Sequence, residues 1–238
     1  MKTISIAAAA LLLLPTFTEG LVGIDWKVSE APSSGMVSIT FPFSIAEAPH
    51  KTGYFFAQQF NFIGQSDVGY TGLQPRPDIN GKPMIHAVFS SFIGGTTTTD
   101  TQCSSGADGG PGVSCAVDFS APYTHIYNLE VQKTSGTTWS GTVVDIVTGE
   151  RIHIGSYTLP SDTKGIQSSQ VGFIEYYPWN DGQAHSCNTL PYTSVVFGVP
   201  MALTAGSLGN AYEYGECVGK VNFRSARTLT GVQVQVGF

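Results

Sequence analysis

The sequence predicts an all-β fold, a two-sheet antiparallel β-sandwich of the jelly-roll type. Three observations lead to this prediction. Apolar and polar residues alternate with a period of two in about ten segments, and clusters of Gly, Pro, Asn and Asp separate most of them. No stretch repeats apolar residues at helical spacing. Many short strands without helices in a chain of this length are typical of sandwiches and jelly rolls.

The clearest strand is the segment 54–63, with the sequence YFFAQQFNFI. Residues that alternate along a strand point to opposite faces of a sheet. One face therefore carries Tyr54, Phe56, Gln58, Phe60 and Phe62, and the other carries Phe55, Ala57, Gln59, Asn61 and Ile63.

The other expected strands follow the same pattern and are separated by turn residues. Two turns are clear: residues 78–82 (DINGK), with Asn-Gly at the centre, and residues 147–150 (VTGE) between two alternating runs. Residues 201–214 are the least strand-like segment, and their glycines favour a loop. The remaining expected strands are 36–43, 69–74, 84–92, 126–133, 138–145, 151–159, 170–177, 194–200 and 232–237.

Composition supports this fold and narrows the function. Only 12% of the chain is charged, about half of the ~25% usual in soluble domains. The chain holds 42% apolar residues and is therefore too apolar for a disordered protein. Eleven Lys and Arg stand against 17 Asp and Glu, and this net charge of −6 disfavours nucleic-acid binding because phosphate repels it.

The N-terminus has the pattern of a secretory signal. Lys2 precedes an apolar run over residues 4–14, Pro15 ends the run, and small residues follow at 18–20. The run is shorter than the ~20 apolar residues that a membrane span needs, and no later segment is long and apolar enough. We expect residues 1–20 to be a signal peptide, residues 21–238 to be one β-sandwich domain, and the protein to be secreted and extracellular.

Four cysteines lie in the expected mature chain, and an even number in an oxidising compartment predicts disulfides. Three pairings are possible. We favour Cys103–Cys115 with Cys187–Cys217 because this pairing closes the shortest loops. The first bridge would hold the glycine-rich stretch 104–114 and contribute roughly 3 kcal/mol. No CxxC spacing favours zinc.

Several motifs appear in a characteristic order: YFFAQQFNF, then GYTGLQ, then LEVQKTSGTTWSGTVVDIVTGERIHIGSYTLP, and finally GFIEYYPWN. Over about residues 54–179 the chain resembles concanavalin-A-like sandwiches of secreted microbial proteins. This resemblance implies a curved sandwich whose concave sheet holds a glycan. The wider fold includes lectins, glycoside hydrolases and polysaccharide lyases, and the fold by itself does not choose among them.

Carboxylates are the first candidates for catalysis, because retaining glycosidases need two of them about 5 Å apart. The E-x-D-x-x-E strand of laminarinase-like hydrolases of this fold is absent. Glu175 stands alone on its strand, between Phe173 and Tyr177 on the same face. Glu130 on another strand is a conceivable partner. The alternative for both is a surface acid or a hydrogen-bonded sheet residue.

A lyase would need a base such as His86 or Tyr177 and a group that neutralises a uronate carboxylate. The sequence Met84-Ile85-His86 resembles the Q-I-H strand of jelly-roll alginate lyases, but Met84 replaces the glutamine. Arg76 and Gln59 are the further members of such a site. Single histidines on strands are more often structural. The expected catalytic candidates are Glu175, His86 and Tyr177.

Sugar binding needs only aromatic faces and amide or charged side chains. Amides on strands that otherwise belong to the core need partners, which a glycan or a ladder between strands would supply. An exposed Trp179 would stack on a sugar, whereas a packed Trp is more common. The candidate binding residues are Gln59, Asn61, Gln74, Arg76, Trp179 and Asn180.

No metal site or cofactor is expected. Asp108-Gly109-Gly110 offers one calcium ligand at most, without the acidic run of a dedicated loop. Since neutral polar residues replace the missing charges, we expect the partner to be an uncharged or weakly charged polysaccharide. We also expect a monomer, without nucleic-acid or membrane partners. The alternatives are a lyase or glycoside hydrolase in the same groove, and a secreted host-surface interaction protein without glycan chemistry.

Overall fold

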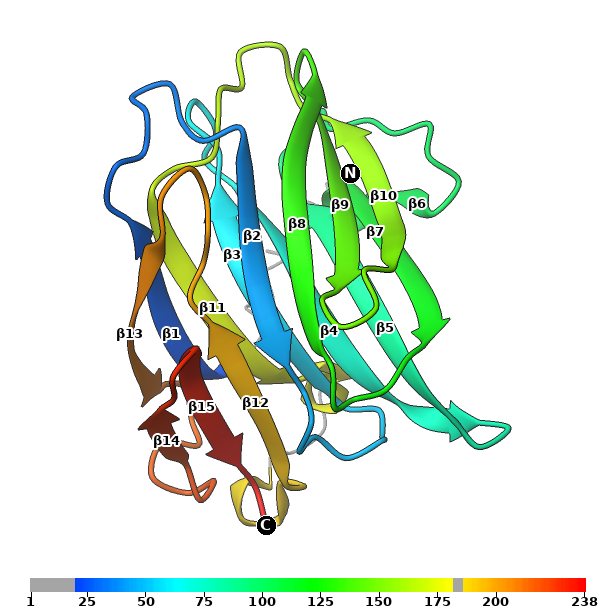
Figure 1. Ribbon diagram of the computed structural model, residues 1–238, viewed down its shortest axis with the longest axis vertical. Coiled ribbons are helices and arrows are strands. Elements are labelled where there is room, and N and C mark those ends of the chain that lie inside the picture. The colour runs from blue at the N-terminus through cyan, green and yellow to red at the C-terminus, as the bar shows by residue number, and fades with distance from the viewer. Residues whose placement is uncertain (1–19, 182–185) are drawn as a thin grey trace, which may run out of the picture.

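The computed structural model describes residues 20–181 and 186–238. Its strands form two antiparallel sheets that pack face to face, which confirms the predicted β-sandwich (Figure 1). The expected signal peptide lies outside the described residues except for Gly20. Among the described residues, no helix is long and apolar enough to cross a membrane.

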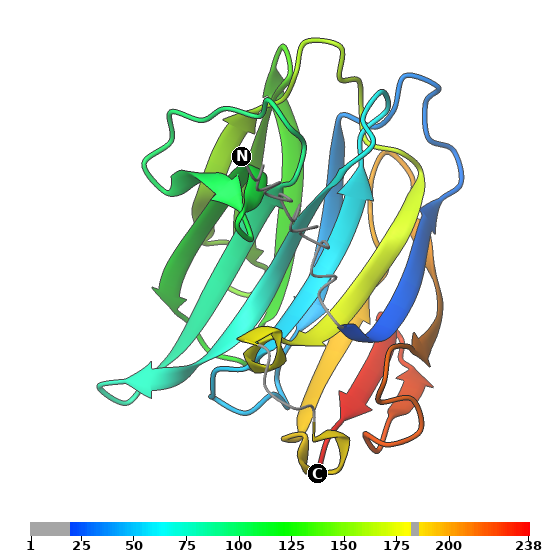
Figure 2. The same cartoon turned by 180° about the vertical axis from the view of Figure 1, so that it is seen from behind.

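One sheet has eight strands and lies behind the other in Figure 1; Figure 2 shows it from the front. In spatial order its strands are β13 (Gly206–Glu213), β1 (Gly20–Val28), β11 (Ser169–Tyr176), β3 (Tyr54–Asn61), β4 (Val68–Ile79), β5 (Lys82–Ser91), β7 (Gly110–Ser120) and β6 (Cys103–Ala107).

The other sheet has seven strands. In spatial order they are β10 (Arg151–Thr158), β9 (Thr138–Asp145), β8 (Ile126–Ser135), β2 (Ser38–Ser44), β12 (Thr193–Gly198), β15 (Gly231–Val236) and β14 (Arg224–Arg227). Two short 3₁₀ helices, η1 (Tyr177–Asp181) and η2 (Cys187–Thr189), follow β11.

The core lies between the sheets and is built mainly from aromatic residues. Trp26, Trp139 and Tyr127 are among its fully buried side chains. The alternation predicted for residues 54–63 holds, because Tyr54, Phe56 and Phe60 belong to this core. Gln58 follows the same inward face and is fully buried beside Gly172.

Both predicted turns connect neighbouring strands. Asn80 (φ 52°) and Gly81 (φ 72°) lie between β4 and β5, with the positive φ angles that a two-residue hairpin turn requires. Between β9 and β10, the Asp145 carboxylate accepts hydrogen bonds from the backbone N–H groups of Val147 (2.9 Å) and Thr148 (3.3 Å). His125 Nδ1 also contacts this carboxylate, at 2.7 Å. Burial by itself would raise the pKa of Asp145, but the hydrogen bonds from His125, Val147 and Thr148 outweigh it and hold the pKa below its usual value.

One segment contradicts the sequence interpretation. Residues 201–214, expected to form a loop, contain β13, which pairs with β1 from Val22↔Glu213 to Val28↔Gly206. Pairing with a neighbour overrides the weak strand preference of glycine, and Leu208 and Ala211 reach the core. The glycine-rich stretch 104–114, which the Cys103–Cys115 bridge was expected to hold, is ordered as parts of β6 and β7.

Both predicted disulfides are present, Cys103–Cys115 between β6 and β7 and Cys187–Cys217 between η2 and the segment after β13. Cys103 and Cys115 lie directly opposite each other in the β6–β7 ladder. The first disulfide therefore holds the outermost strand of the eight-stranded sheet against its neighbour.

Candidate functional site

The outward surface of the eight-stranded sheet, here called the outer face, carries a second apolar cluster separate from the core. It consists of Phe55, Ala57, Val88 and Phe173, with Tyr70 and Tyr177 packed against it. The ring of Phe55 lies 5.2 Å from that of Tyr70 and 5.7 Å from that of Phe173. Phe55, Ala57, Val88 and Phe173 are themselves buried, whereas Tyr70 and Tyr177 are only partly buried and leave aromatic surface on this face.

Glu175 lies at the edge of this cluster. Its neighbour Ile174 is in the core, so the alternation of β11 turns Glu175 outward together with Phe173, as predicted. The Glu175 side chain is only 5% exposed, and Asn180 of η1 donates a hydrogen bond to its Oε1 at 2.7 Å. Burial raises the pKa of Glu175; the hydrogen bond from Asn180 opposes this shift, and the negative charge of Asp108 adds to it.

Strand register places Glu175 in line with four other residues of the outer face. Glu175 pairs with Phe55, and Phe56 pairs with Leu73, so the next residue pair along the ladder is Phe55 with Gln74. Gln74 pairs with His86, and His86 pairs with Asp118. We call Glu175, Phe55, Gln74, His86 and Asp118 the transverse row. Glu175 and Gln74 are two strands apart, which is about 10 Å between their backbones.

Gln74 is held by Arg76, which also contacts Tyr177; both were predicted site residues. Arg76 Nη2 donates to Gln74 Oε1 at 2.7 Å, and Arg76 Nη1 donates to the Tyr177 hydroxyl at 3.0 Å. The Tyr177 hydroxyl also accepts from the backbone N–H of Gly53. Because Gln74 Oε1 is occupied by Arg76, the Nε2 group is the end of this amide that is available to donate to a ligand.

His86, beyond Gln74, contacts Asp118 through Nδ1 at 2.8 Å. Burial lowers the pKa of His86; the hydrogen bond to Asp118 opposes this shift, and the positive charge of Arg76 adds to it. The imidazole therefore stays neutral to a lower pH than an ordinary histidine does.

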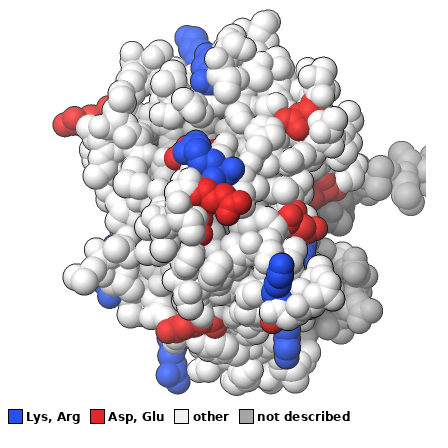
Figure 3. Space-filling view, turned by 45° about the vertical axis from the view of Figure 1, so that its right-hand side comes forward, with Lys and Arg blue, Asp and Glu red and all other residues white. Residues whose placement is uncertain are grey.

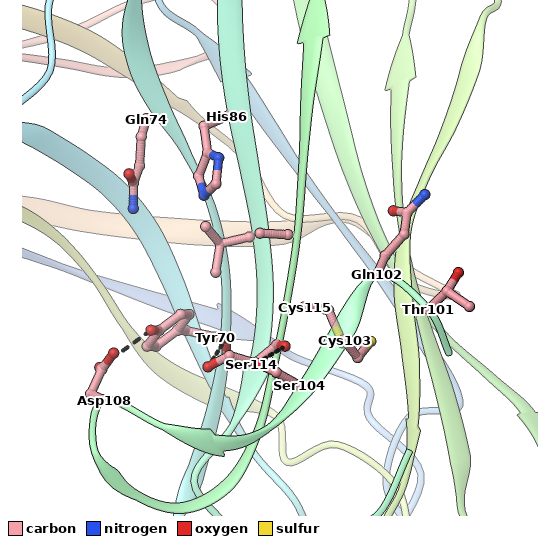
Figure 4. Close-up of a pocket in the computed structure, with 13 residues that line it drawn as sticks. Tyr70, Gln74, His86, Thr101, Gln102, Cys103, Ser104, Asp108, Ser114 and Cys115 are labelled. Atoms are coloured by element: carbon pink, nitrogen blue, oxygen red, sulfur yellow. Dashed lines mark hydrogen bonds between the residues drawn. A yellow bond between two sulfur atoms is a disulfide. The ribbon is translucent and has the colours of Figure 1, made fainter. Parts of the chain in front are cut away.

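A hollow of about 410 Å³ opens on the outer face beside the transverse row. Figure 4 shows Gln74 and His86 at one end and Tyr70 with Asp108 at the other. The Tyr70 hydroxyl donates to Asp108 Oδ2 at 3.4 Å. Asp108 lies at the β6–β7 turn, with a φ of 46°. The Cys103–Cys115 disulfide also lines the hollow.

The remaining predicted residues are only partly associated with this group. Gln59 and Asn61 continue along the outer face of β3, and Asn61 Oδ1 accepts a hydrogen bond from Gln170, a ladder between strands. Asn180 binds Glu175. Trp179 packs against Tyr176, with ring centroids 5.4 Å apart, and against the core.

Glu130 is not a partner of Glu175. It lies on β8 of the seven-stranded sheet, where Arg151 donates to its carboxylate at 2.6 Å. The alternation of β8 turns Glu130 away from the core, so the two carboxyl groups face opposite sides of the sandwich.

Tyr70 and Asp118 were not among the residues predicted from the sequence, and Asp108 was considered only as a possible calcium ligand. Tyr70 and Asp118 share the outward alternation of their strands, but only the register of β4, β5 and β7 reveals their neighbours. Asp108 is the only acidic residue of the sequence between Cys103 and Cys115, and the predicted disulfide indicated that this stretch is held in place. Within the described residues no group of three or more His, Cys, Asp or Glu could hold a metal ion.

Comparison with solved structures identifies similar folds. Scytalido-glutamic peptidase, solved with a peptide-based transition-state analogue, has 11% sequence identity over 92% of this chain and 98% of that chain, with a TM-score of 0.50. SCP-B of the Eqolisin family, bound to the tripeptide Ala-Ile-His, has the same identity and coverages with a TM-score of 0.44. Tailspike protein 2 of bacteriophage CBA120 has 13% identity over 81% of this chain and 24% of that chain, with a TM-score of 0.30. The likeness to scytalido-glutamic peptidase concerns the fold alone.

No protein-family model matches the chain, and the comparison with curated proteins gives no match.

Proposed function

We propose that this protein is a secreted peptide hydrolase whose reaction takes place on the outer face, between Glu175 and Gln74. One observation carries this proposal. A single nearly buried carboxyl group with a raised pKa faces outward, two strands from an amide whose donor end is available. Carboxyl groups with perturbed pKa values in such surroundings mark candidate catalytic sites.

Peptide hydrolysis at this site needs a general base and a hydrogen-bond donor to the oxygen of the tetrahedral intermediate. Ionised Glu175 takes a proton from a water molecule while the water oxygen attacks the carbonyl carbon of a peptide bond. The oxygen of the tetrahedral intermediate receives a hydrogen bond from Gln74 Nε2. Protonated Glu175 then gives its proton to the leaving nitrogen as the C–N bond breaks, which regenerates the carboxylate. A peptide lying over Phe55 would place its carbonyl group between the two side chains.

Two further observations agree with this proposal. The fold is shared with a protein described as a glutamic peptidase, and that enzyme was solved with a peptide-based analogue. An acidic residue on the same kind of sandwich is therefore a reasonable centre for peptide hydrolysis, although fold likeness alone assigns no activity. The two disulfides and the N-terminal signal pattern support secretion.

The test is cleavage of a peptide library by the purified mature protein, followed by mass spectrometry at several pH values between 3 and 8. We expect Glu175→Gln to reduce kcat/KM by about 10³ and Gln74→Ala by about 10². Glu130→Gln is the matched control, because this glutamate lies on the opposite side of the sandwich, and it should retain full activity. Cleavage that survives Glu175→Gln would refute the assignment.

A second candidate is binding or cleavage of a neutral glycan on the same face. The observation that favours it is the aromatic cluster of Phe55, Tyr70 and Phe173 close to the amides of Gln59 and Asn61. Another hollow, of about 540 Å³, is lined by Asp25, Gln170 and Ser207 toward the β13 edge, so the outer face could accommodate a long chain. Retention on a glycan array, or new reducing ends from a polysaccharide panel, together with no peptide cleavage would favour this candidate.

A further inference from the structure

We propose that the hollow beside the transverse row is a specificity pocket for a basic side chain, lysine or arginine, of the peptide substrate, and that Asp108 recognises its charge. This inference rests on the proposed peptide hydrolysis, but its test separates the two.

The hollow lies where it could receive the side chain of a substrate residue next to the cleaved peptide bond. Gln74 and His86 belong both to the transverse row and to the lining, so the hollow begins where the proposed reaction takes place (Figure 4). From there it extends along β4 and β5 past Val88 toward Tyr70 and Ser90. Its volume of about 410 Å³ lies in the range of ligand pockets, ~300–1,000 Å³, and admits a long side chain.

The charges of the hollow favour a cation at the end far from Gln74. Asp108 is the only carboxylate among the described lining residues, and the lining contains no Lys or Arg. Most other polar groups there are hydroxyls and amides, including those of Ser90, Thr101 and Gln102. Arg76 lies beyond the opposite end, bound to Gln74 and Tyr177. A substrate carbonyl would therefore lie toward Arg76, and an ammonium or guanidinium group toward Asp108.

His86 does not oppose this arrangement. Its imidazole contacts Asp118, and burial lowers its pKa, so the neutral form persists to a lower pH than in an ordinary histidine. At a given pH, His86 therefore offsets the negative charge of Asp108 less than an ordinary histidine would.

Asp108 is held over the outer face by its strands. The Cys103–Cys115 disulfide ties β6 to β7 at the base of the hairpin, and the pairing continues to Ala107↔Gly110 around the turn. The Tyr70 hydroxyl fixes the carboxylate on the side of the hollow. Asp108 is nevertheless exposed to solvent, so its effect on selectivity should be modest and should weaken with salt.

The experiment measures kcat/KM for matched peptides that carry Lys, Gln or Glu at each position flanking the cleaved bond. At one position we expect wild-type protein to prefer Lys over Gln by about fivefold, the equivalent of ~1 kcal/mol, and Glu to be the poorest. Asp108→Asn should remove the preference while cleavage of the Gln peptide continues, and Asp108→Lys should reverse it toward Glu. Asp162→Asn, an exposed aspartate outside the hollow, is the control and should keep the preference.

The outcomes distinguish this inference from the proposed function. Cleavage without a Lys preference, or a preference that survives in both folded Asp108 variants, overturns the pocket assignment but leaves Glu175 as the catalytic centre. Absence of cleavage of any peptide overturns both. Cleavage of oligomers of a protonated amino sugar in place of peptides would keep a cation in the hollow but refute the peptide substrate. Thermal melting of each variant establishes that it is folded.

Discussion

At the scale of the residue, Glu175 combines properties that conflict in an ordinary surface acid. Its strand turns it outward, yet its side chain is only 5% exposed and accepts a hydrogen bond from Asn180. Burial disfavours the charged form and raises its pKa, and the Asp108 charge acts in the same direction. The proposed peptide hydrolysis would use this carboxyl group as its general base.

The raised pKa of Glu175 makes a prediction about stability. A carboxyl group whose pKa is higher in the folded state binds protons more tightly there, so its ionisation opposes folding as pH rises through the folded pKa. Below the usual glutamate pKa of about 4.3 this cost is absent. Glu175→Gln should therefore melt at a higher temperature than wild type at pH 7.5, by about 2–4 °C for each kcal/mol of cost, and the difference should vanish near pH 4.

Calorimetry at the two pH values, with Glu130→Gln as a surface control, measures this effect. The partly exposed Glu130–Arg151 pair should change the melting temperature little at either pH. A Glu175→Gln variant that is less stable than wild type at pH 7.5 would mean that the ionised carboxylate stabilises the fold.

At the scale of the element, the β6–β7 hairpin shows how a disulfide replaces missing core contacts. The stretch 104–114 is rich in Gly and Ser and supplies few apolar side chains. Cys103 and Cys115 face each other across its base, and Gly155 of β10 packs directly against this bridge, since a Cβ there would lie 2.5 Å from Cys103 Sγ. The bridge therefore joins the edge of one sheet to the other sheet as well as closing the hairpin.

Removing this bridge should destabilise the protein and disturb the hollow together. The double variant Cys103→Ala/Cys115→Ala should lose about 3 kcal/mol from loop entropy and roughly 6–12 °C in melting temperature. Hydrogen exchange should increase most in β6 and in the first half of β7. An unchanged melting temperature would show that the hairpin is held by its strand pairing alone.

The element scale also marks the limit of sequence-based prediction. Strands with strong alternation, such as β3 and β9, were predicted with nearly correct bounds, because their apolar faces meet the core. Residues 20–28, 206–213 and 224–227 lack such alternation or are rich in glycine, and their strands exist because a neighbouring strand supplies the hydrogen bonds. Local sequence does not contain that partner.

For the whole molecule, the low charge of the sequence is visible on the surface. In the view of Figure 3, acidic and basic residues form small separate groups on a largely uncharged surface. The residue types of the site were visible in the sequence: Gln74, Arg76, Glu175 and Tyr177 were all candidates. Their arrangement was not, because the transverse row depends on the register of five strands from distant parts of the chain. Sequence spacing did not show that Glu130 and Glu175 lie on opposite sides of the sandwich, or that Asp108 lies on the outer face.

If Glu175 is the base of the proposed reaction, the pKa of its carboxyl group must also appear in the pH dependence of the activity. We would determine the pKa of the Glu175 carboxyl carbon by NMR, assign the signal with Glu175→Gln, and compare it with the acid limb of kcat/KM for a cleaved peptide. The groups that influence this titration are Asp108 from the β6–β7 turn, Tyr70 from β4, Asn180 from η1 and Tyr214 after β13. If Glu175 is the base, both measurements should give one pKa, above the usual glutamate value, and activity should be lost as pH falls through it. A Glu175 pKa at or below about 4.3, or an acid limb that does not coincide with it, would contradict the account.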